Sequence, residues 1–181
     1  MLQPWQQPEV IKHTECLIRS YHHWTGGELL SGACTPSESA RQLFEAPFVV
    51  VSHGTQADPI LNYGNQAALN LWQLKWEELI QLPSRLTAEA PSREERARLL
   101  ERVTRDGYIS DYSGVRISST GQRFMIMQAT VWNLRSDEGA YCGQAAMFKE
   151  WKYFDKLTAT KVENLTSTLV HHKIETSSKK P

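Results

Sequence analysis

The feature that most constrains this chain is a run of three strand-like segments, joined by tight turns, that follows a long helix-like segment. The strand-like segments cover residues 108–118, 122–134 and 141–148, and the sequences Ser-Thr-Gly (119–121) and Ser-Asp-Glu-Gly (136–139) separate them. Glycine and small polar residues at such positions are typical of hairpin connections. Hairpins pair neighbouring strands antiparallel, so this half of the chain predicts an antiparallel sheet.

The first half of the chain adds helices and two more short strands. Val10, Leu17, Tyr21 and Trp24 recur at helical spacing, which predicts an amphipathic helix over residues 8–24. A second helix is expected from a capping box at residues 35–38. Apolar runs at 48–51 and 60–63 predict strands, Asn65 is expected to cap a short helix, and a capping box at 92–95 is expected to begin the longest one.

The central strand, residues 122–134, is apolar on both faces. Strict alternation places Phe124, Ile126, Gln128, Thr130 and Trp132 on one face. An antiparallel sheet with one wet face would show polar residues on the other side, and this strand does not. We therefore expect helices on one face, and the N-terminal helix or a second subunit on the other.

The amino-acid composition narrows the range of binding partners that the chain is expected to have. Lys plus Arg equal Asp plus Glu at 20 each, so no basic field favours nucleic acid. Cys16, Cys34 and Cys142 lack the spacing of a zinc site, and the adjacent pairs His22-His23 and His171-His172 lack helical partners, so no metal is expected. Neither a secretory leader nor a membrane span is recognisable, and a cytoplasmic protein is expected.

Several stretches carry a resemblance to a known family. They are 48–53 (Phe-Val-Val-Val-Ser-His), 58–69 (Asp-Pro-Ile-Leu-Asn-Tyr-Gly-Asn-Gln-Ala-Ala-Leu), 82–86, 93–99, 107–119 and 131–133. Together they resemble a stand-alone MEKHLA domain, a PAS-like module also found at the C-terminus of plant homeodomain leucine-zipper regulators.

The resemblance implies an α+β fold with a five-stranded antiparallel sheet, short helices on one face and an N-terminal helical extension. It divides the chain into an N-terminal extension (1–46), a PAS-like MEKHLA domain (47–152) and a C-terminal tail (153–181) that is partly helical or disordered. Photoactive flavin relatives carry a cysteine, and haem relatives carry a histidine in the long helix. Neither is found at the matching positions here, so no cofactor is expected.

The expected ligand pocket lies between the sheet and its short helices. Arg116 is its most consequential polar residue, because a guanidinium offers a two-pronged site for an anion or carboxylate. Tyr108 and Tyr112 are expected to share its strand face, and a structural ion pair with a glutamate is the alternative role. The charged run 93–105 is interpreted as a solvated helix face. The expected pocket residues are His53, Asn62, Arg85, Tyr112, Arg116, Gln128, Thr130 and Trp132.

The sequence thus predicts a non-catalytic sensory or regulatory module that binds a small molecule or a protein, with a homodimer through the N-terminal helix as one expected arrangement. One alternative is a small cone-like isomerase or hydrolase using His53 and Arg116. Another is a subunit that uses its sheet face as an interface. An enzyme requires His53 and Arg116 to share one buried void.

Overall fold

The computed structural model of the chain describes residues 2–32 and 35–154. Its helices are α1 (Pro8–Thr25), α2 (Pro36–Glu45), α3 (Gln66–Trp72), α4 (Trp76–Leu79) and α5 (Ala90–Asp106), with the 3-10 turns η1 (Pro4–Gln6) and η2 (Ser84–Thr87). Its strands are β1 (Val49–His53), β2 (Leu61–Gly64), β3 (Tyr108–Ile117), β4 (Arg123–Arg135), β5 (Tyr141–Phe148) and β6 (Glu150–Tyr153).

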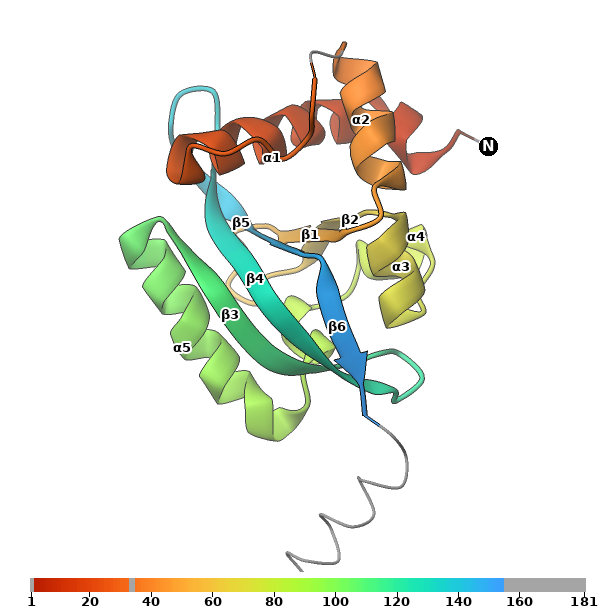
Figure 1. Cartoon of the computed structure of the whole chain (residues 1–181), viewed down its shortest axis with the longest axis vertical. Helices are drawn as coiled ribbons and strands as arrows, with labels where there is room; N and C mark the ends of the chain where they lie inside the picture. Colours follow the sequence, from red (N-terminus) through yellow and green to blue (C-terminus); the bar gives the residue numbers. More distant parts are fainter. Residues whose placement is uncertain (1, 33–34, 155–181) are drawn as a thin grey trace, which may run out of the picture.

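The strands form one antiparallel sheet in the order β2-β1-β5-β4-β3, with β6 paired to β4 where β5 ends (Figure 1). The five predicted strands are present, so the predicted α+β class with an antiparallel sheet is confirmed. The sequence analysis missed β6. It follows β5 after a single residue and continues the pairing along the Phe124 end of β4.

Helices lie on both faces of the sheet. Figure 1 shows α1 and α2 across one end of the molecule, and α5 along the β3 edge. Backbone contacts hold α1 to β4: Trp24 Nε1 donates to Asn133 O at 2.8 Å, and Arg135 N donates to Ser20 Oγ at 2.9 Å. The amphipathic helix predicted over 8–24 therefore covers the sheet of its own chain. No helix in the described ranges is long and apolar enough to cross a membrane.

Glycines end the two longest helices. Gly26 adopts a left-handed conformation (φ 70°) and donates to His22 O, which stops α1. Gly107 (φ 92°) stops α5, and a Cβ there would lie 2.3 Å from the Trp24 ring, so only glycine lets α1 approach this closely. The start of α5 differs from the prediction: the helix begins at Ala90, before Ser92, because Pro91 suits a first helical turn.

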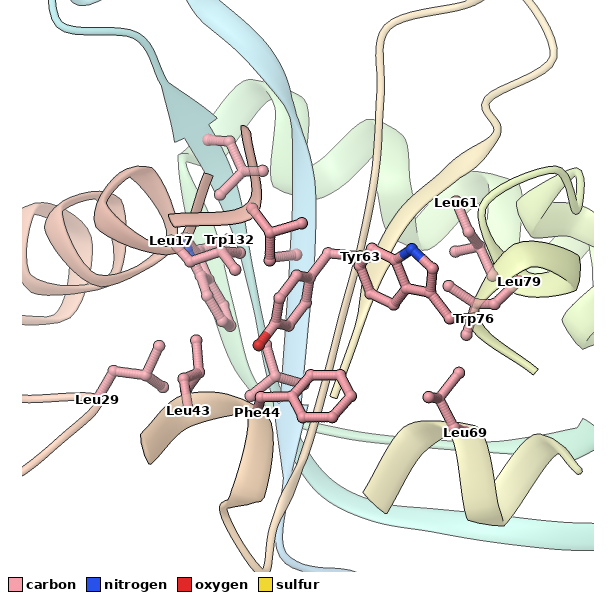
Figure 2. Packing of buried hydrophobic residues seen from close by; sticks show 14 residues of the cluster. Leu17, Leu29, Leu43, Phe44, Leu61, Tyr63, Leu69, Trp76, Leu79 and Trp132 are labelled. Carbon is pink, nitrogen blue, oxygen red and sulfur yellow. The ribbon is translucent and has the colours of Figure 1, made fainter. Parts of the chain in front are cut away.

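The core between the sheet and α1 is rich in aromatic side chains. Tyr63 of β2 is fully buried, and its ring meets Trp76 edge to face at 6.1 Å between centroids. Figure 2 shows Tyr63 between Leu17 and Trp132 on one side and Trp76 on the other. Trp132 packs in turn against Tyr21 of α1, at 5.1 Å between centroids. Edge-to-face geometry is favourable for aromatic rings and adds to the effect of burial.

Asn65 connects three elements through one buried side chain. Its Oδ1 accepts from Val50 N (3.0 Å) and Ala68 N (3.1 Å), and its Nδ2 donates to Leu43 O (3.2 Å) and Phe48 O (2.7 Å). The predicted cap of α3 is therefore confirmed, and the same amide also holds β1 and the end of α2. Each of these buried backbone groups would be costly to leave unpaired.

Two β-bulges interrupt the pairing of β3 with β4. On β3, Ser110 and Asp111 together oppose a single residue of β4, and on β4, Met127 and Gln128 together oppose a single residue of β3. Asp111 and Gln128 both have positive φ, 65° and 50°. A bulge adds one residue, so the alternation of side chains between the two faces reverses at each. The register is restored beyond the second bulge.

We expect Leu17→Ala to lower the free energy of unfolding by about 2–5 kcal/mol, because it removes a fully buried side chain between α1 and the sheet. Urea denaturation measures the change. Glu15→Ala, on the exposed side of α1, is the matched control and should stay within about 0.5 kcal/mol of the parent. Equal effects of the two substitutions would show that α1 is not docked on the sheet in solution.

Candidate ligand cavity

A small cavity lies between the sheet and α5, on the face opposite α1. Its walls come from β1, β3, β4 and β5 with Leu61 of β2, and α5, η2 and Trp72 of α3 close it. The lining is largely apolar and includes Val51, Leu61, Trp72, Leu99, Leu100, Ile126, Ala129, Val131, Ala146 and Phe148; its polar members include His53, Thr87, Arg96, Tyr112, Arg116 and Gln144.

Arg116 reaches this cavity from β3 and is 6% exposed. Its guanidinium donates to Val115 O (2.8 Å) and to Tyr112 Oη (2.9 Å), and it lies 5.3 Å from the centroid of the Tyr112 ring. Among the ion pairs of the described residues, none involves Arg116. The alternative role, a structural ion pair with a glutamate, therefore has no support in this geometry.

Arg96 brings a second guanidinium to the same cavity, from α5. Burial and the charge of Arg116 lower the pKa of Arg96 to about 10, so the group is still charged at neutral pH. No ion pair with a carboxylate is formed by Arg96 within the described ranges. Two like charges thus face one largely apolar space, an arrangement that opposes folding unless an anion joins them.

His53 contributes an imidazole at the end of β1. Its Nδ1 lies 2.9 Å from Gly54 O and donates to it, because a carbonyl oxygen only accepts. Burial lowers the pKa of His53, the Gly54 contact opposes that shift, and the charge of Arg96 adds to it, so the ring is neutral. Its Nε2 is therefore an acceptor; it is buried and makes no hydrogen bond of normal geometry among the described residues, although the nearby Gln144 amide also opposes the lowering of the pKa of His53.

The structure brings three of the eight sequence-predicted site residues to this cavity: His53, Tyr112 and Arg116. Gln128, Thr130 and Trp132 lie elsewhere, and the bulge at Gln128 is the reason. Beyond it, Ala129 and Val131 take the cavity face, while Gln128 is exposed and Trp132 packs under α1. The bulge at Asp111 has the same effect on β3, where the exposed Tyr108 does not share the face of Tyr112.

Asn62 and Arg85 also lie outside the cavity. Arg85 is about half exposed and pairs with Asp58, with 3.1 Å between Nε and Oδ2. Asn62 accepts from Ser52 Oγ at 2.6 Å, and Ser52 Oγ lies 2.8 Å from His13 Nε2. The serine proton goes to Asn62, so His13 Nε2 is the donor in the second contact. This chain of hydrogen bonds joins β2 and β1 to α1.

Arg96 and Gln144 are cavity residues that are not predicted from the sequence. The charged run that contains Arg96 predicts a solvated helix face, yet Arg96 precedes Leu99 by three positions and the buried Val103 by seven, which places it on the apolar stripe of α5. Gln144 is 2% exposed, and its amide donates to Leu100 O and Asn133 Oδ1, both at 3.0 Å. The sequence signal for Gln144 is a polar glutamine within an otherwise largely apolar strand.

The cavity measures about 60 Å³. One water needs roughly 10–15 Å³ by this measure, so the space suits a ligand of about four to six non-hydrogen atoms. Pockets for drug-sized ligands are commonly about 300–1,000 Å³. Within residues 2–32 and 35–154, no cluster of three or more His, Cys, Asp or Glu side chains is placed to hold a metal ion.

Comparison with solved structures identifies the fold as that of a PAS domain. The PAS domain of a Colwellia psychrerythraea protein superposes with a TM-score of 0.54 at 13% identity, covering 66% of this chain and 96% of that one. An RNA-binding light-oxygen-voltage receptor superposes with a TM-score of 0.56 at 19% identity, covering 82% of this chain and 42% of that one.

The chain belongs to the MEKHLA domain family, whose model matches residues 11–153. Among curated proteins it is similar to the homeobox-leucine zipper protein ATHB-14 of Arabidopsis thaliana, 28% identical over 81% of this chain and 18% of that protein. It is also similar to HOX32 of Oryza sativa subsp. japonica, 22% identical over 83% of this chain and 18% of that protein. The match thus spans less than a fifth of these relatives.

We expect Arg96→Met to raise the free energy of unfolding of the ligand-free protein by about 1 kcal/mol or more. The substitution removes a buried charge repelled by Arg116 and keeps an unbranched apolar side chain in its place. Arg102→Met on the exposed side of α5 is the control, with a change within about 0.5 kcal/mol. A clear loss of stability in Arg96→Met would mean that a partner within the protein neutralises Arg96.

We expect acid to lower the free energy of unfolding through protonation of His13. Burial lowers the pKa of His13 from 6.5 to about 4. Between those pH values the unfolded chain binds a proton that the folded chain does not, so the free energy of unfolding falls as the pH falls through this window, by roughly 3 kcal/mol. His13→Gln keeps a donor for Ser52 and does not titrate, so its denaturation midpoint should depend less on pH. Identical pH profiles would contradict the assignment.

Proposed function

We propose that this protein is a non-catalytic regulatory module of PAS-like fold that binds a small carboxylate in the cavity between the sheet and α5. The observation that carries the proposal is the pair of guanidinium groups, Arg96 and Arg116, which line one cavity and form no ion pair with a carboxylate of the described residues. A ligand anion would convert their repulsion into attraction, and a carboxylate matches the fork of each group.

The other cavity residues favour a particular kind of carboxylate. Leu99, Ile126 and Val131 supply an apolar wall, which suits a short carbon chain. His53 Nε2 is an unpaired acceptor, which suits a ligand hydroxyl. With room for about four to six non-hydrogen atoms, the proposed ligands are short carboxylic acids, and those with a hydroxyl group should bind best.

β1 offers a route from the cavity to α1. Successive residues of a strand point to opposite faces, and here His53 lines the cavity while Ser52 Oγ meets His13 of α1 at 2.8 Å. A ligand that shifts β1 would alter how α1 packs on the sheet. We propose that occupancy changes the docking of α1, by as much as the ligand prefers one docking over the other.

An enzymatic role is the second candidate, because His53 and Arg116 line the same cavity, as an isomerase or hydrolase would require. The hydroxyls nearby are already engaged: Ser52 Oγ donates to Asn62, and Thr87 Oγ1 donates to Ser84 O at 2.7 Å. A bound acid that stays chemically unchanged favours the binding module. Its conversion, followed by proton NMR, would favour the enzyme.

Binding of acetate, propionate, lactate and butyrate to the full chain, measured by calorimetry, tests the proposal. We expect saturable binding, with lactate tighter than propionate because its hydroxyl can donate to His53 Nε2. Arg116→Ala should weaken binding at least 10-fold, since it removes a charged partner, and Arg116→Lys should restore only part of it.

The control is Arg85→Ala, which removes an exposed arginine outside the cavity and should leave the affinity unchanged. Circular dichroism should confirm that the variants fold. If no acid in the series binds, or if Arg85→Ala weakens binding as much as Arg116→Ala, the cavity is not the carboxylate site.

A further inference from the structure

Two cysteines far apart in the sequence lie in contact. Cys16 of α1 and Cys142 of β5 are 126 positions apart, and their sulfur atoms are 3.8 Å from each other. Both thiols are free, and Cys16 Sγ also donates to Arg135 O at 3.3 Å. A disulfide needs about 2.0 Å between the sulfurs, so a side-chain rotation and a small shift of α1 would join them.

Solvent reaches this pair. Both cysteines are partly exposed and line an open surface hollow of about 670 Å³, together with Lys12, Arg19 and Asp137. The hollow lies on the α1 side, and its lining shares no residue with the cavity of Arg96 and Arg116. A small oxidant can therefore approach the sulfurs without entering the proposed ligand site.

We propose that Cys16 and Cys142 form an oxidation site, in which a peroxide converts the two thiols to a disulfide that fastens α1 to β5. In the first step one thiolate attacks a peroxide oxygen, the O–O bond breaks, and a sulfenic acid and one water (or alcohol, from an organic peroxide) result. In the second step the other sulfur attacks the sulfenic sulfur, and a second water leaves. The two thiols are oxidised, and the peroxide is reduced by two electrons.

Both thiols line the hollow, so a peroxide can reach either sulfur, and the other sulfur then resolves the sulfenic acid. Burial, together with the neighbouring Cys16, raises the pKa of Cys142 to about 11, which lowers the fraction of the reactive thiolate at that sulfur.

The bond would close a loop that contains most of the domain. Cross-links across long loops restrict the unfolded chain most strongly. The same bond would prevent α1 from changing its packing position on the sheet. The oxidation site is independent of the proposed carboxylate site, and its test needs no ligand.

The experiment treats the Cys34→Ser chain, in which only Cys16 and Cys142 remain, with a small molar excess of hydrogen peroxide. Cys34 lies outside the described residues, and its removal prevents exchange. We expect non-reducing peptide mass spectrometry to find the Cys16–Cys142 peptide as the main product, and the melting temperature to rise by about 5–10 °C and to return on reduction.

A dimedone trap added during oxidation should label the remaining cysteine of the pair most strongly in Cys142→Ser and Cys16→Ser variants, in which the resolving sulfur is missing. The proposal fails if peroxide yields separate oxidised cysteines or intermolecular dimers in place of the internal link. It also fails if the link forms only in denaturant, because the native contact would then play no part.

Discussion

The paired bulges at Asp111 and Gln128 determine which side chains lie on each face of the sheet. Above them, Ile109 and Val131 pack against α5; below them, Arg116 and Ile126 face the cavity. Without the added residue on each strand, alternation would turn Gln128, Thr130 and Trp132 toward the cavity and remove Trp132 from its contact with α1. Both the aromatic core under α1 and the small charged cavity depend on this local change of face.

The buried polar groups of this protein are of two kinds, those with hydrogen-bond or charge partners and those without. Asn65 has partners for both ends of its amide, and so it connects α2, β1 and α3 without leaving a group unpaired. Arg96 and Arg116 repel each other and form no ion pair within the described residues; Asp58 acts on Arg96 through its charge alone. Folding alone gains nothing from the second arrangement, because buried unpaired charge opposes it. The proposed binding of an anion would give the two arginines a role.

The fold was predictable from the sequence where local chemistry decides it. The capping box at Thr35 and Glu38, the Asn65 cap and the apolar stripe of α1 all produce the elements they predicted. Face assignments were predictable only where alternation is uninterrupted. Asp tolerates the left-handed conformation, so Asp111 is compatible with a bulge, but Gln128 carries no such signal. The resulting error explains why three predicted cavity residues lie outside the cavity, whereas Arg96 is not predicted because its charged run indicates a solvated helix face.

The position of α1 ties these observations together. The family match begins at residue 11, within α1, and runs to residue 153, so it spans the boundary predicted between residues 46 and 47. The physical reason is visible in the core, since Tyr63 and Trp132 are fully buried only because α1 and α2 cover them. The sheet therefore has a helix layer on each face, and β1 touches both, through Ser52 on one side and His53 on the other. These two neighbouring residues make β1 a direct physical connection between the cavity and α1, so a displacement of the strand at one would be felt at the other.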